Sequence, residues 1–256
     1  MSPESFALAV GVAVFAGGLI GLVLQRALSE KHTTGPSRDM IGAVVGLLTL
    51  FCALVTGLLI WTAYGVYAGQ NTAIQTLASK VLQLDLALED YGPDAKSERL
   101  ALRDRLGKTI NQVWGTKESD ANFAAHDFAA AIRFLRDSEK ALERLQPSTD
   151  EQKQAVAAAK SAVESIGQSR LQMSFALTAP VSYPLLLIVV GWVFFLFCGF
   201  GLMSRGGAMP VIVLAVGAVA VATAVLLILD LSNPYLGLFR ASPAPLEEVL
   251  AVMGKE

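Results

Sequence analysis

The stretch MIGAVVGLLTLFCALVTGLLIWTAY, from Met40 to Tyr64, decides the fold of this chain. It contains no Asp, Glu, Lys, Arg or His. A transmembrane helix needs roughly 20 consecutive apolar residues, and within lipid an isolated segment satisfies its backbone hydrogen bonds only as a helix. The stretch therefore predicts a membrane-spanning helix.

Three further stretches reach spanning length with no charge in their interiors: Phe6–Leu24, Leu185–Met203 and Met209–Leu229. The first is interpreted as a retained helix, because the residues before it include Glu4 but no Lys or Arg, unlike a signal peptide. Of the 256 residues 54% are hydrophobic and 16% are charged, whereas soluble domains carry about 25% charged residues. We expect an all-α integral membrane protein with four transmembrane helices and a helical extramembrane bundle between the second and third.

The predicted spans divide the chain into four parts. We expect a first transmembrane helix pair at residues 1–64 and a second pair at residues 184–230. Between them lies a helical extramembrane domain at residues 65–183, continuous with the second and third spans. A tail with a short helix occupies residues 231–256. With four spans, both termini and the extramembrane domain lie on one side of the membrane.

Basic residues near the spans predict the orientation, because cytoplasmic loops carry an excess of Lys and Arg. The two short loops contain Arg26, Lys31, Arg38 and Arg205. Close to the spans on the other side lie Lys80, Arg170 and Arg240. This difference favours short loops in the cytoplasm. In the inner membrane of a bacterium, the extramembrane domain and both termini would then lie in the periplasm.

The extramembrane segment reads as four helices whose apolar residues step by three and four positions. The first of these seams comprises Ile74, Leu77, Val81, Leu84 and Leu88, and the second Leu102, Leu106, Ile110 and Val113. Gly92 and Pro93 predict the break between these two helices. Ser148 and Glu151 have the spacing of a capping box at the start of the fourth helix. Such seams are typical of a coiled coil or bundle, and they lie either within one chain or between subunits.

Small residues recur on one face of each of the first two spans. Gly17 and Gly21 form a GxxxG motif in the first span, and the second span has a stripe of Gly42, Gly46, Thr49, Ala53 and Gly57. Small residues let helices approach closely in lipid. Two interpretations remain open: packing against the chain's own helices, or a subunit contact or pore lining. In the second, Thr49 and Gly57 would line an ion pathway.

The sequence lacks the motifs of common catalytic and transport chemistry. It has no Walker A, G-x-S-x-G, H-E-x-x-H or G-x-G-x-x-G motif. No ionisable Asp, Glu, Lys, Arg or His lies inside a predicted span, which argues against an ion-coupled transporter. Cys52 and Cys198 lie in apolar runs without metal-ligand spacing, and a net charge of -2 offers no basic footprint for nucleic acid. We expect no enzyme activity, no cofactor or metal, and no nucleic-acid partner.

One arginine falls on the apolar seam that leads to the third span. In GQSRLQMS, Gly167–Ser174, the residue is Arg170. Three interpretations remain open. Arg170 pairs with Asp85 or Glu89 or turns to solvent; it extends toward lipid headgroups; or, repeated around an oligomer, it forms a basic ring at a pore mouth that concentrates anions.

The tail after the last span contains Asp230, Pro234, Tyr235, Gly237, Ser242 and Pro243. At these positions it resembles the tail of the bestrophin-like family of bacterial membrane proteins. The stretch Leu82–Leu106, with its Tyr-Gly-Pro, and the approach to the third span are similar to family sequences as well. The chain departs from the family at two places. Ser232 and Asn233 stand where many members have Asp-Arg, and Gln70 and Asn71 stand near a position where many have Glu.

The resemblance implies an oligomeric ion channel, and distant kinship with bestrophins implies anion conduction. The soluble part of a true bestrophin is cytosolic, which conflicts with the orientation above. The expected partners are membrane lipid, further copies of the chain in a homo-oligomer, and inorganic ions. The alternative function is a non-enzymatic membrane sensor or scaffold that signals through the extramembrane domain.

In the tail, Tyr235 and Phe239 are interpreted as interfacial anchors, or else the tail packs against a specific surface.

Overall fold

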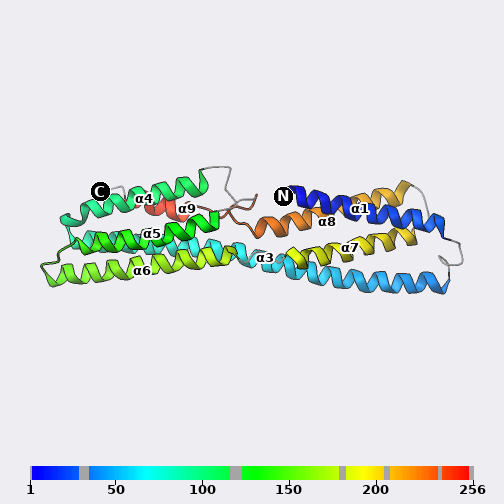
Figure 1. The fold of residues 1–256 in the computed structure, drawn as a ribbon, viewed down its shortest axis with the longest axis horizontal. Helices are drawn as coiled ribbons and strands as arrows, with labels where there is room; N and C mark the ends of the chain where they lie inside the picture. Colours follow the sequence, from blue (N-terminus) through cyan, green and yellow to red (C-terminus); the bar gives the residue numbers. More distant parts are fainter. Residues whose placement is uncertain are drawn as a thin grey trace. The chain divides into compact units, whose positions relative to one another are not determined.

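The computed structural model describes residues 2–28, 35–115, 123–178, 183–204, 208–235 and 238–253. All regular elements in these ranges are helical, which confirms the all-α prediction (Figure 1). They are α1 (Pro3–Ala27), α3 (Pro36–Tyr91), the short 3₁₀ helix η1 (Pro93–Ala95), α4 (Lys96–Trp114), α5 (Phe123–Glu143), α6 (Asp150–Thr178), α7 (Tyr183–Met203), α8 (Ala208–Leu231) and α9 (Ala244–Val252). Four of them, α1, α3, α7 and α8, are long and apolar enough to span a membrane.

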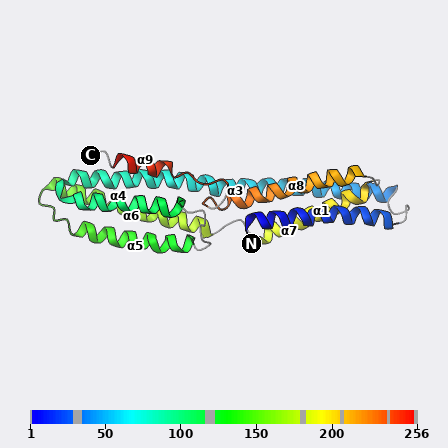
Figure 2. The same cartoon turned by 90° about the horizontal axis from the view of Figure 1, so that it is seen from above.

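Helix α3 runs unbroken for 56 residues because no proline interrupts it (Figure 2). It ends where Gly92 adopts a φ of 105°, a left-handed conformation that favours glycine. The Gly92 N–H donates to the carbonyl oxygen of Glu89 at 2.9 Å, and Pro93 begins η1. Whether the extramembrane helices continue into the third span lies outside the described residues, since 179–182 separate α6 from α7.

The chain forms two compact units. We call the first, Met1–Gly65 with Val181–Ser232, the membrane unit, and the second, Val66–Pro180 with Asn233–Glu256, the extramembrane unit. The tail from Asn233 onward therefore groups with the extramembrane helices and not with the fourth span, from which it follows directly in sequence.

Inside the membrane unit, α1 packs along both α7 and α8. Glycine makes the α1–α7 contact close. A Cβ added to Gly17 would lie 2.8 Å from the carbonyl oxygen of Phe194, and one added to Gly21 would overlap the carbonyl oxygen of Cys198. The GxxxG motif of the first span therefore lies at a helix contact within the chain.

The start of α3 packs against the end of α7. The Arg38 guanidinium donates to the carbonyl oxygen of Met203 at 3.2 Å. A Cβ added to Gly42 would lie 3.2 Å from the Met203 methyl group, and Val45 packs directly against Gly199. The small residues at this end of α3 thus serve contacts inside the chain.

The extramembrane unit has one hydrophobic core, to which α3, α4, α5, α6, α9 and the tail all contribute. Its members include the seam residues Ile74, Val81, Leu84, Leu88, Leu102, Leu106 and Ile110, together with Val163, Ile166, Tyr235, Leu246 and Val249. These seam residues are buried within a single chain, so this part of the seam is intramolecular.

The cap of α6 differs by one residue from the prediction. The Thr149 hydroxyl accepts from the Gln152 N–H at 3.2 Å, and the Gln152 amide oxygen accepts from the Ser148 N–H at 2.9 Å. Thr149 therefore caps the helix and Gln152 binds the N–H of the residue before the cap, whereas the S-x-x-E spacing predicts Ser148 and Glu151 in a reciprocal capping box. The sequence offers both pairs at equivalent spacing, so the local pattern did not distinguish them.

Candidate functional site

One face of the second span is left open within the chain. The buried residues of α3 in the membrane unit, Val45, Cys52, Leu59 and Ala63, form a single stripe. The small residues Gly46, Thr49, Ala53 and Gly57 are all exposed on another face. A Cβ added at Gly46 or Gly57 would meet nothing within 4 Å. The two motifs of small residues therefore differ, because the GxxxG of α1 is covered by the chain and most of the α3 stripe is not.

Burial is lowest in α3 among the four helices long enough to span a membrane, although α8 is nearly as open, with 22% of its apolar window buried. In the most apolar window of α1 39% of the residues are buried, whereas the corresponding share for α3 is 17%. Large apolar side chains flank the open face, among them Leu50, Leu54 and Trp61, with exposures of 69, 70 and 72%. In a membrane this surface meets either lipid or another protein helix.

The open face has polar but uncharged groups. The Thr49 hydroxyl donates to the carbonyl oxygen of Val45 at 2.8 Å, which leaves the lone pairs of its oxygen as acceptors. From Met40 to Tyr64 the sequence has no ionisable Asp, Glu, Lys, Arg or His. Such a face can offer hydroxyl and backbone dipoles to a passing ion, but no fixed charge.

Arg170 belongs to the extramembrane unit, whereas Thr49 and Gly57 belong to the membrane unit. Its guanidinium carbon lies 5.9 Å from the centre of the Phe134 ring, a cation–π distance. It also lines a cavity of about 40 Å³ beside Trp114 and Tyr235. The side chain is thus held among aromatic residues.

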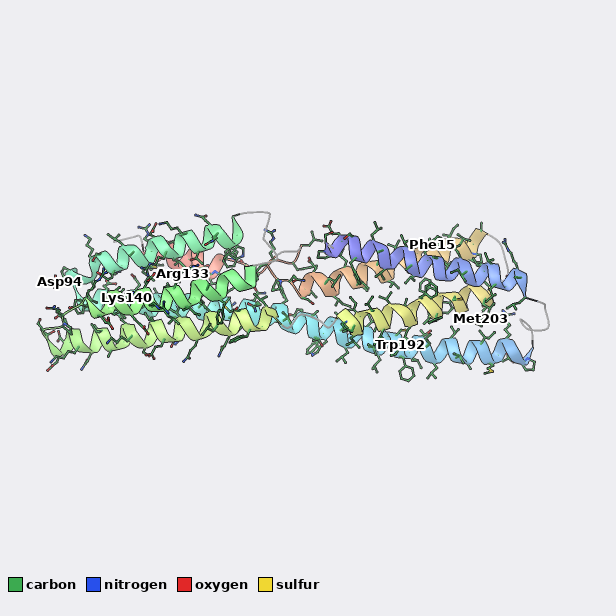
Figure 3. All side chains as sticks on the ribbon, viewed as in Figure 1. Phe15, Asp94, Arg133, Lys140, Trp192 and Met203 are labelled. Atoms are coloured by element: carbon green, nitrogen blue, oxygen red, sulfur yellow. The ribbon has the colours of Figure 1, made fainter. Side chains whose placement is uncertain are left out.

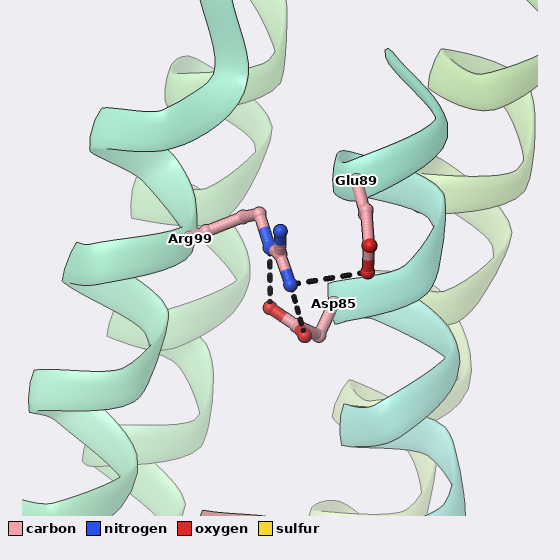
Figure 4. A network of polar contacts seen from close by, with 3 residues as sticks. All are labelled: Asp85, Glu89 and Arg99. Carbon is pink, nitrogen blue, oxygen red and sulfur yellow. Dashed lines mark hydrogen bonds and ion pairs between the residues drawn. The ribbon is translucent and has the colours of Figure 1, made fainter. Parts of the chain in front are cut away.

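The carboxylates considered as partners of Arg170 bind a different arginine (Figure 4). Arg99 on α4 donates from Nε to Asp85 Oδ1 at 3.0 Å and from Nη2 to Asp85 Oδ2 at 2.9 Å. Its Nη2 also reaches Glu89 Oε2 at 3.2 Å. The interpretation that paired Arg170 with Asp85 or Glu89 is therefore wrong. The turn at Gly92 brings α4 back along α3, and the sequence pattern did not indicate which arginine would face the acids.

The tail motif is built into the extramembrane core. The Tyr235 hydroxyl donates to the Gln70 amide oxygen at 2.9 Å, and the Gln70 amide nitrogen donates to the carbonyl oxygen of Met173 at 3.2 Å. The Tyr235 ring packs edge-on against Trp114 with centroids 5.9 Å apart. Gln70 is 2% exposed and Tyr235 6%. The interpretation of Tyr235 as an interfacial anchor is therefore wrong, and the tail packs against a specific surface.

Other tail positions reinforce this attachment. The Trp114 indole N–H donates to the carbonyl oxygen of Ala241 at 2.8 Å, and the Ala241 N–H donates to that of Pro234 at 2.7 Å. Pro234 and Asp230 are buried, and Gly237 lies outside the described residues. The spacing of the seam could have identified Gln70. This residue lies four positions before Ile74, where one further step of the seam falls.

Replacing Tyr235 with phenylalanine is expected to lower the stability of the extramembrane unit by about 1–3 kcal/mol, because the buried Gln70 oxygen loses its donor. Thermal unfolding of the full chain in detergent, followed by circular dichroism, would measure the change. Tyr91→Phe is the matched control. Tyr91 is also a buried tyrosine of this unit, and the described residues contain no hydrogen bond of its hydroxyl. Equal shifts in the two variants would contradict the role assigned to the Tyr235 hydroxyl.

Comparison with known proteins gives one family match. The model of the bestrophin-like domain matches residues 12–246. No curated protein and no solved structure shows a significant match.

Proposed function

Because the chain belongs to the bestrophin-like family, we propose that it forms a homo-oligomeric ion channel in a bacterial inner membrane. The family consists in general of ion channels and not of enzymes. The observation that carries the proposal is the open face of α3, where Gly46, Thr49, Ala53 and Gly57 are exposed within one chain.

A small-residue face suits a protein environment better than a lipid one. Small residues are enriched where helix backbones approach one another in membranes. Copies of α3 arranged around an axis would bury the flanking leucines between neighbours. The small residues would then leave space along the axis, with Thr49 and Gly57 beside the ion pathway.

The chemistry of this face favours conduction over coupled transport. Ion-coupled transporters use ionisable groups at depth in the membrane. A pore lined by hydroxyls, backbone dipoles and apolar constrictions needs none. We propose that selectivity for anions arises outside the span, where a ring of Arg170 side chains would attract them.

The orientation is part of the proposal. The basic residues of the short loops support an orientation in which these loops lie in the cytoplasm and the extramembrane unit, with both termini, lies in the periplasm. An impermeant thiol reagent applied to cells that express a Ser79→Cys variant tests this orientation, since Ser79 is exposed on α3. Labelling of intact cells supports the orientation, and labelling only after lysis reverses it.

A sensor or scaffold is the second candidate, and the continuity of α3 favours it. One helix from Pro36 to Tyr91 joins the second span to the extramembrane core. A displacement at one end of such a helix would be passed to the other. This function requires an oligomer or partner but no ion flux.

Ion flux from liposomes that contain the purified oligomer distinguishes the two candidates. Gly57→Phe is expected to bring flux close to that of empty liposomes, because the new ring would enter the pathway. The chain should still fold, since nothing lies within 4 Å of a Cβ at this position. Leu58→Phe is the matched control, because the next residue points about 100° away around the helix. Equal flux through the two variants would contradict a pore along this face.

The same assay tests the proposed anion selectivity. Arg170→Ala is expected to lower the permeability ratio of anions to cations, measured from reversal potentials with each ion substituted in turn. An unchanged ratio in a folded oligomer would rule out the arginine ring. If the unmodified oligomer conducts no ion while folded and intact, the sensor or scaffold becomes the better assignment.

A further inference from the structure

A cavity of about 130 Å³ lies inside the extramembrane unit, lined by α3, α4, α5 and α6. We call it the bundle cavity. Its polar lining residues are Ser97, Glu98 and Arg105 from α4, Ser138 from α5, and Arg144 just after the end of α5. All of them belong to the same compact unit. The cavity and its polar groups are therefore a property of that unit alone.

Ser138 has a buried hydroxyl without a partner among the described residues. The residue is 8% exposed and lines the bundle cavity. Each of the other buried polar residues that the structure describes has a hydrogen-bonding or electrostatic partner: Gln70, Asp85, Ser174, Asp230 and Ser232. Leaving a buried hydroxyl unpaired costs free energy. Ser138 is thus the one member of this group whose partner has to come from the cavity.

Helices α4 and α5 run in opposite directions past the cavity. In Figure 3, Asp94, which comes just before α4, lies at the end of the unit toward which α5 runs from Arg133 to Lys140. The start of α4 therefore lies beside the end of α5, and the later residues of α4 lie beside the earlier residues of α5.

This antiparallel arrangement sorts the polar groups into two ends of the cavity. Arg105 follows Glu98 by seven positions, a rise of about 10 Å, and Ser138 precedes Arg144 by six positions, a rise of about 9 Å. Ser138 and Arg105 therefore share one end, which we call the Ser138 end. Arg144 lies toward Glu98 and Ser97 at the other end.

The charges that line the cavity favour an anion at the Ser138 end. Two cations, Arg105 and Arg144, and one anion, Glu98, leave a single positive charge. Glu98 and Arg144 lie at the same end, and Glu98 also accepts a hydrogen bond from Ser97. Arg105 is partly exposed, and no hydrogen bond or ion pair joins its guanidinium to another residue that the structure describes. The exposed acids of α5 do not line the cavity: Asp137, Glu139 and Glu143.

The wall between the two polar ends is apolar. Leu102 on α4 and Leu142 on α5 lie between the polar residues of their helices, and Val163 on α6 lines the cavity as well. Their exposures are 7, 3 and 1%. An apolar cavity of about 150 Å³ admits benzene. The bundle cavity therefore suits a molecule of roughly that size, with a charged group at one end and a short alkyl chain.

We propose that the bundle cavity binds a short aliphatic monocarboxylate. Its carboxylate accepts hydrogen bonds from the Ser138 hydroxyl and the Arg105 guanidinium, and its chain lies against Leu102 and Leu142. Guanidinium and carboxylate form strong charge-assisted hydrogen bonds, and one negative charge balances the excess positive charge of the lining. An α-amino acid would place its ammonium group beside Arg105, and inorganic phosphate has no apolar part to cover the wall. Binding at this site does not depend on ion conduction.

Isothermal titration calorimetry of the full chain in detergent tests the proposal, with pentanoate as the probe and a titration into detergent alone as the blank. We expect saturable binding with one site per chain. Norvaline, which adds an α-ammonium group to the same chain, and inorganic phosphate should each bind at least about tenfold more weakly. Absence of saturable pentanoate binding would overturn the proposal and leave a cavity that holds only water. Tighter binding of norvaline or phosphate would overturn the assigned ligand class.

The Ser138 hydroxyl has a readout that a structural role would not produce. Ser138→Ala is expected to weaken pentanoate binding about tenfold or more, because the carboxylate loses a donor. The thermal unfolding midpoint of the ligand-free variant should not fall, because no described residue loses a hydrogen bond. Unchanged affinity, or a lower midpoint in the ligand-free variant, would refute the role assigned to this hydroxyl.

The guanidinium has a matched control on α5. Arg105→Gln is expected to weaken pentanoate binding about tenfold or more. Arg136→Gln removes the same charge from an exposed residue that does not line the cavity, and it should bind pentanoate as the unmodified chain does. Equal affinities of the two variants would refute the contact between Arg105 and the carboxylate.

Filling the cavity tests where the ligand binds. Ala141 lines the cavity, and Ala141→Leu is expected to abolish pentanoate binding because the added atoms occupy the space of the alkyl chain. Ala129→Leu adds the same atoms at an exposed position of α5 outside the lining. Circular dichroism would verify that both variants are folded. Equal binding by the two folded variants would place the ligand elsewhere and overturn the proposal.

Discussion

Asp85→Asn is expected to destabilise the extramembrane unit by about 3 kcal/mol, at the lower end of the 3–5 kcal/mol found when one member of a buried ion pair is removed. The Asp85 side chain is 5% exposed and receives two hydrogen bonds from the Arg99 guanidinium. Asparagine keeps the shape but not the charge, so Arg99 would remain largely buried. Glu89, which also pairs with Arg99, is 38% exposed and compensates only in part.

The loss should appear as a fall of about 10 °C in the thermal unfolding midpoint of the full chain in detergent. Lys108→Ala is the matched control, since it breaks an ion pair with Asp104 in which both side chains are well exposed. Such surface pairs contribute about 0–1 kcal/mol. Replacing both Asp85 and Arg99 with leucine should recover much of the loss, because two well-packed apolar residues leave no unpaired charge. Similar midpoints for Asp85→Asn and Lys108→Ala would refute a stabilising role of the buried pair.

Gly21→Val is expected to prevent the membrane unit from folding. A Cβ at this position overlaps the Cys198 carbonyl oxygen and lies 3.0 Å from the Gly201 Cα. These are backbone atoms of α7, so no side-chain rotation relieves the overlap, and α1 and α7 would have to separate. Overpacking of side chains costs about 1–3 kcal/mol, and overlap with a backbone should exceed that range.

Size-exclusion chromatography of detergent-extracted protein would measure the yield of folded chain. Gly46→Val is the matched control on the second span, because nothing lies within 4 Å of its added Cβ. We expect folded Gly46→Val protein, with any change confined to the oligomer peak. Normal recovery of Gly21→Val would contradict the close approach of α1 and α7.

The family and the positions of the spanning helices could be predicted from the sequence. Long uncharged stretches can satisfy their backbone hydrogen bonds in lipid only within the segment itself, so hydropathy alone identifies the helices. The break at Gly92 was equally predictable, because a glycine with positive φ before a proline ends a helix through local geometry. The apolar seam of the extramembrane helices followed from the spacing of its residues.

The partners of individual side chains could not be predicted in this way. Arg99 and Arg170 both lie on helices next to α3, yet Asp85 and Glu89 face Arg99. Tyr235 follows a span closely enough to suggest an interfacial residue, yet its hydroxyl reaches Gln70, 165 positions away in sequence. Such contacts depend on how helices distant in sequence pack, and periodicity within one helix has no information about that packing.

Gly21 and Gly46 show the difference between what the sequence and what the tertiary structure determined. By itself the sequence determined that Gly21 and Gly46 lie in spanning helices, at positions where a second helix could approach closely. Only the tertiary structure decided that the α7 backbone fills the space beside Gly21 while the space beside Gly46 stays open. The physical reason is that hydropathy and backbone hydrogen bonding act within each segment and specify a helix. The neighbour of each face is set by the packing of all four spanning helices together.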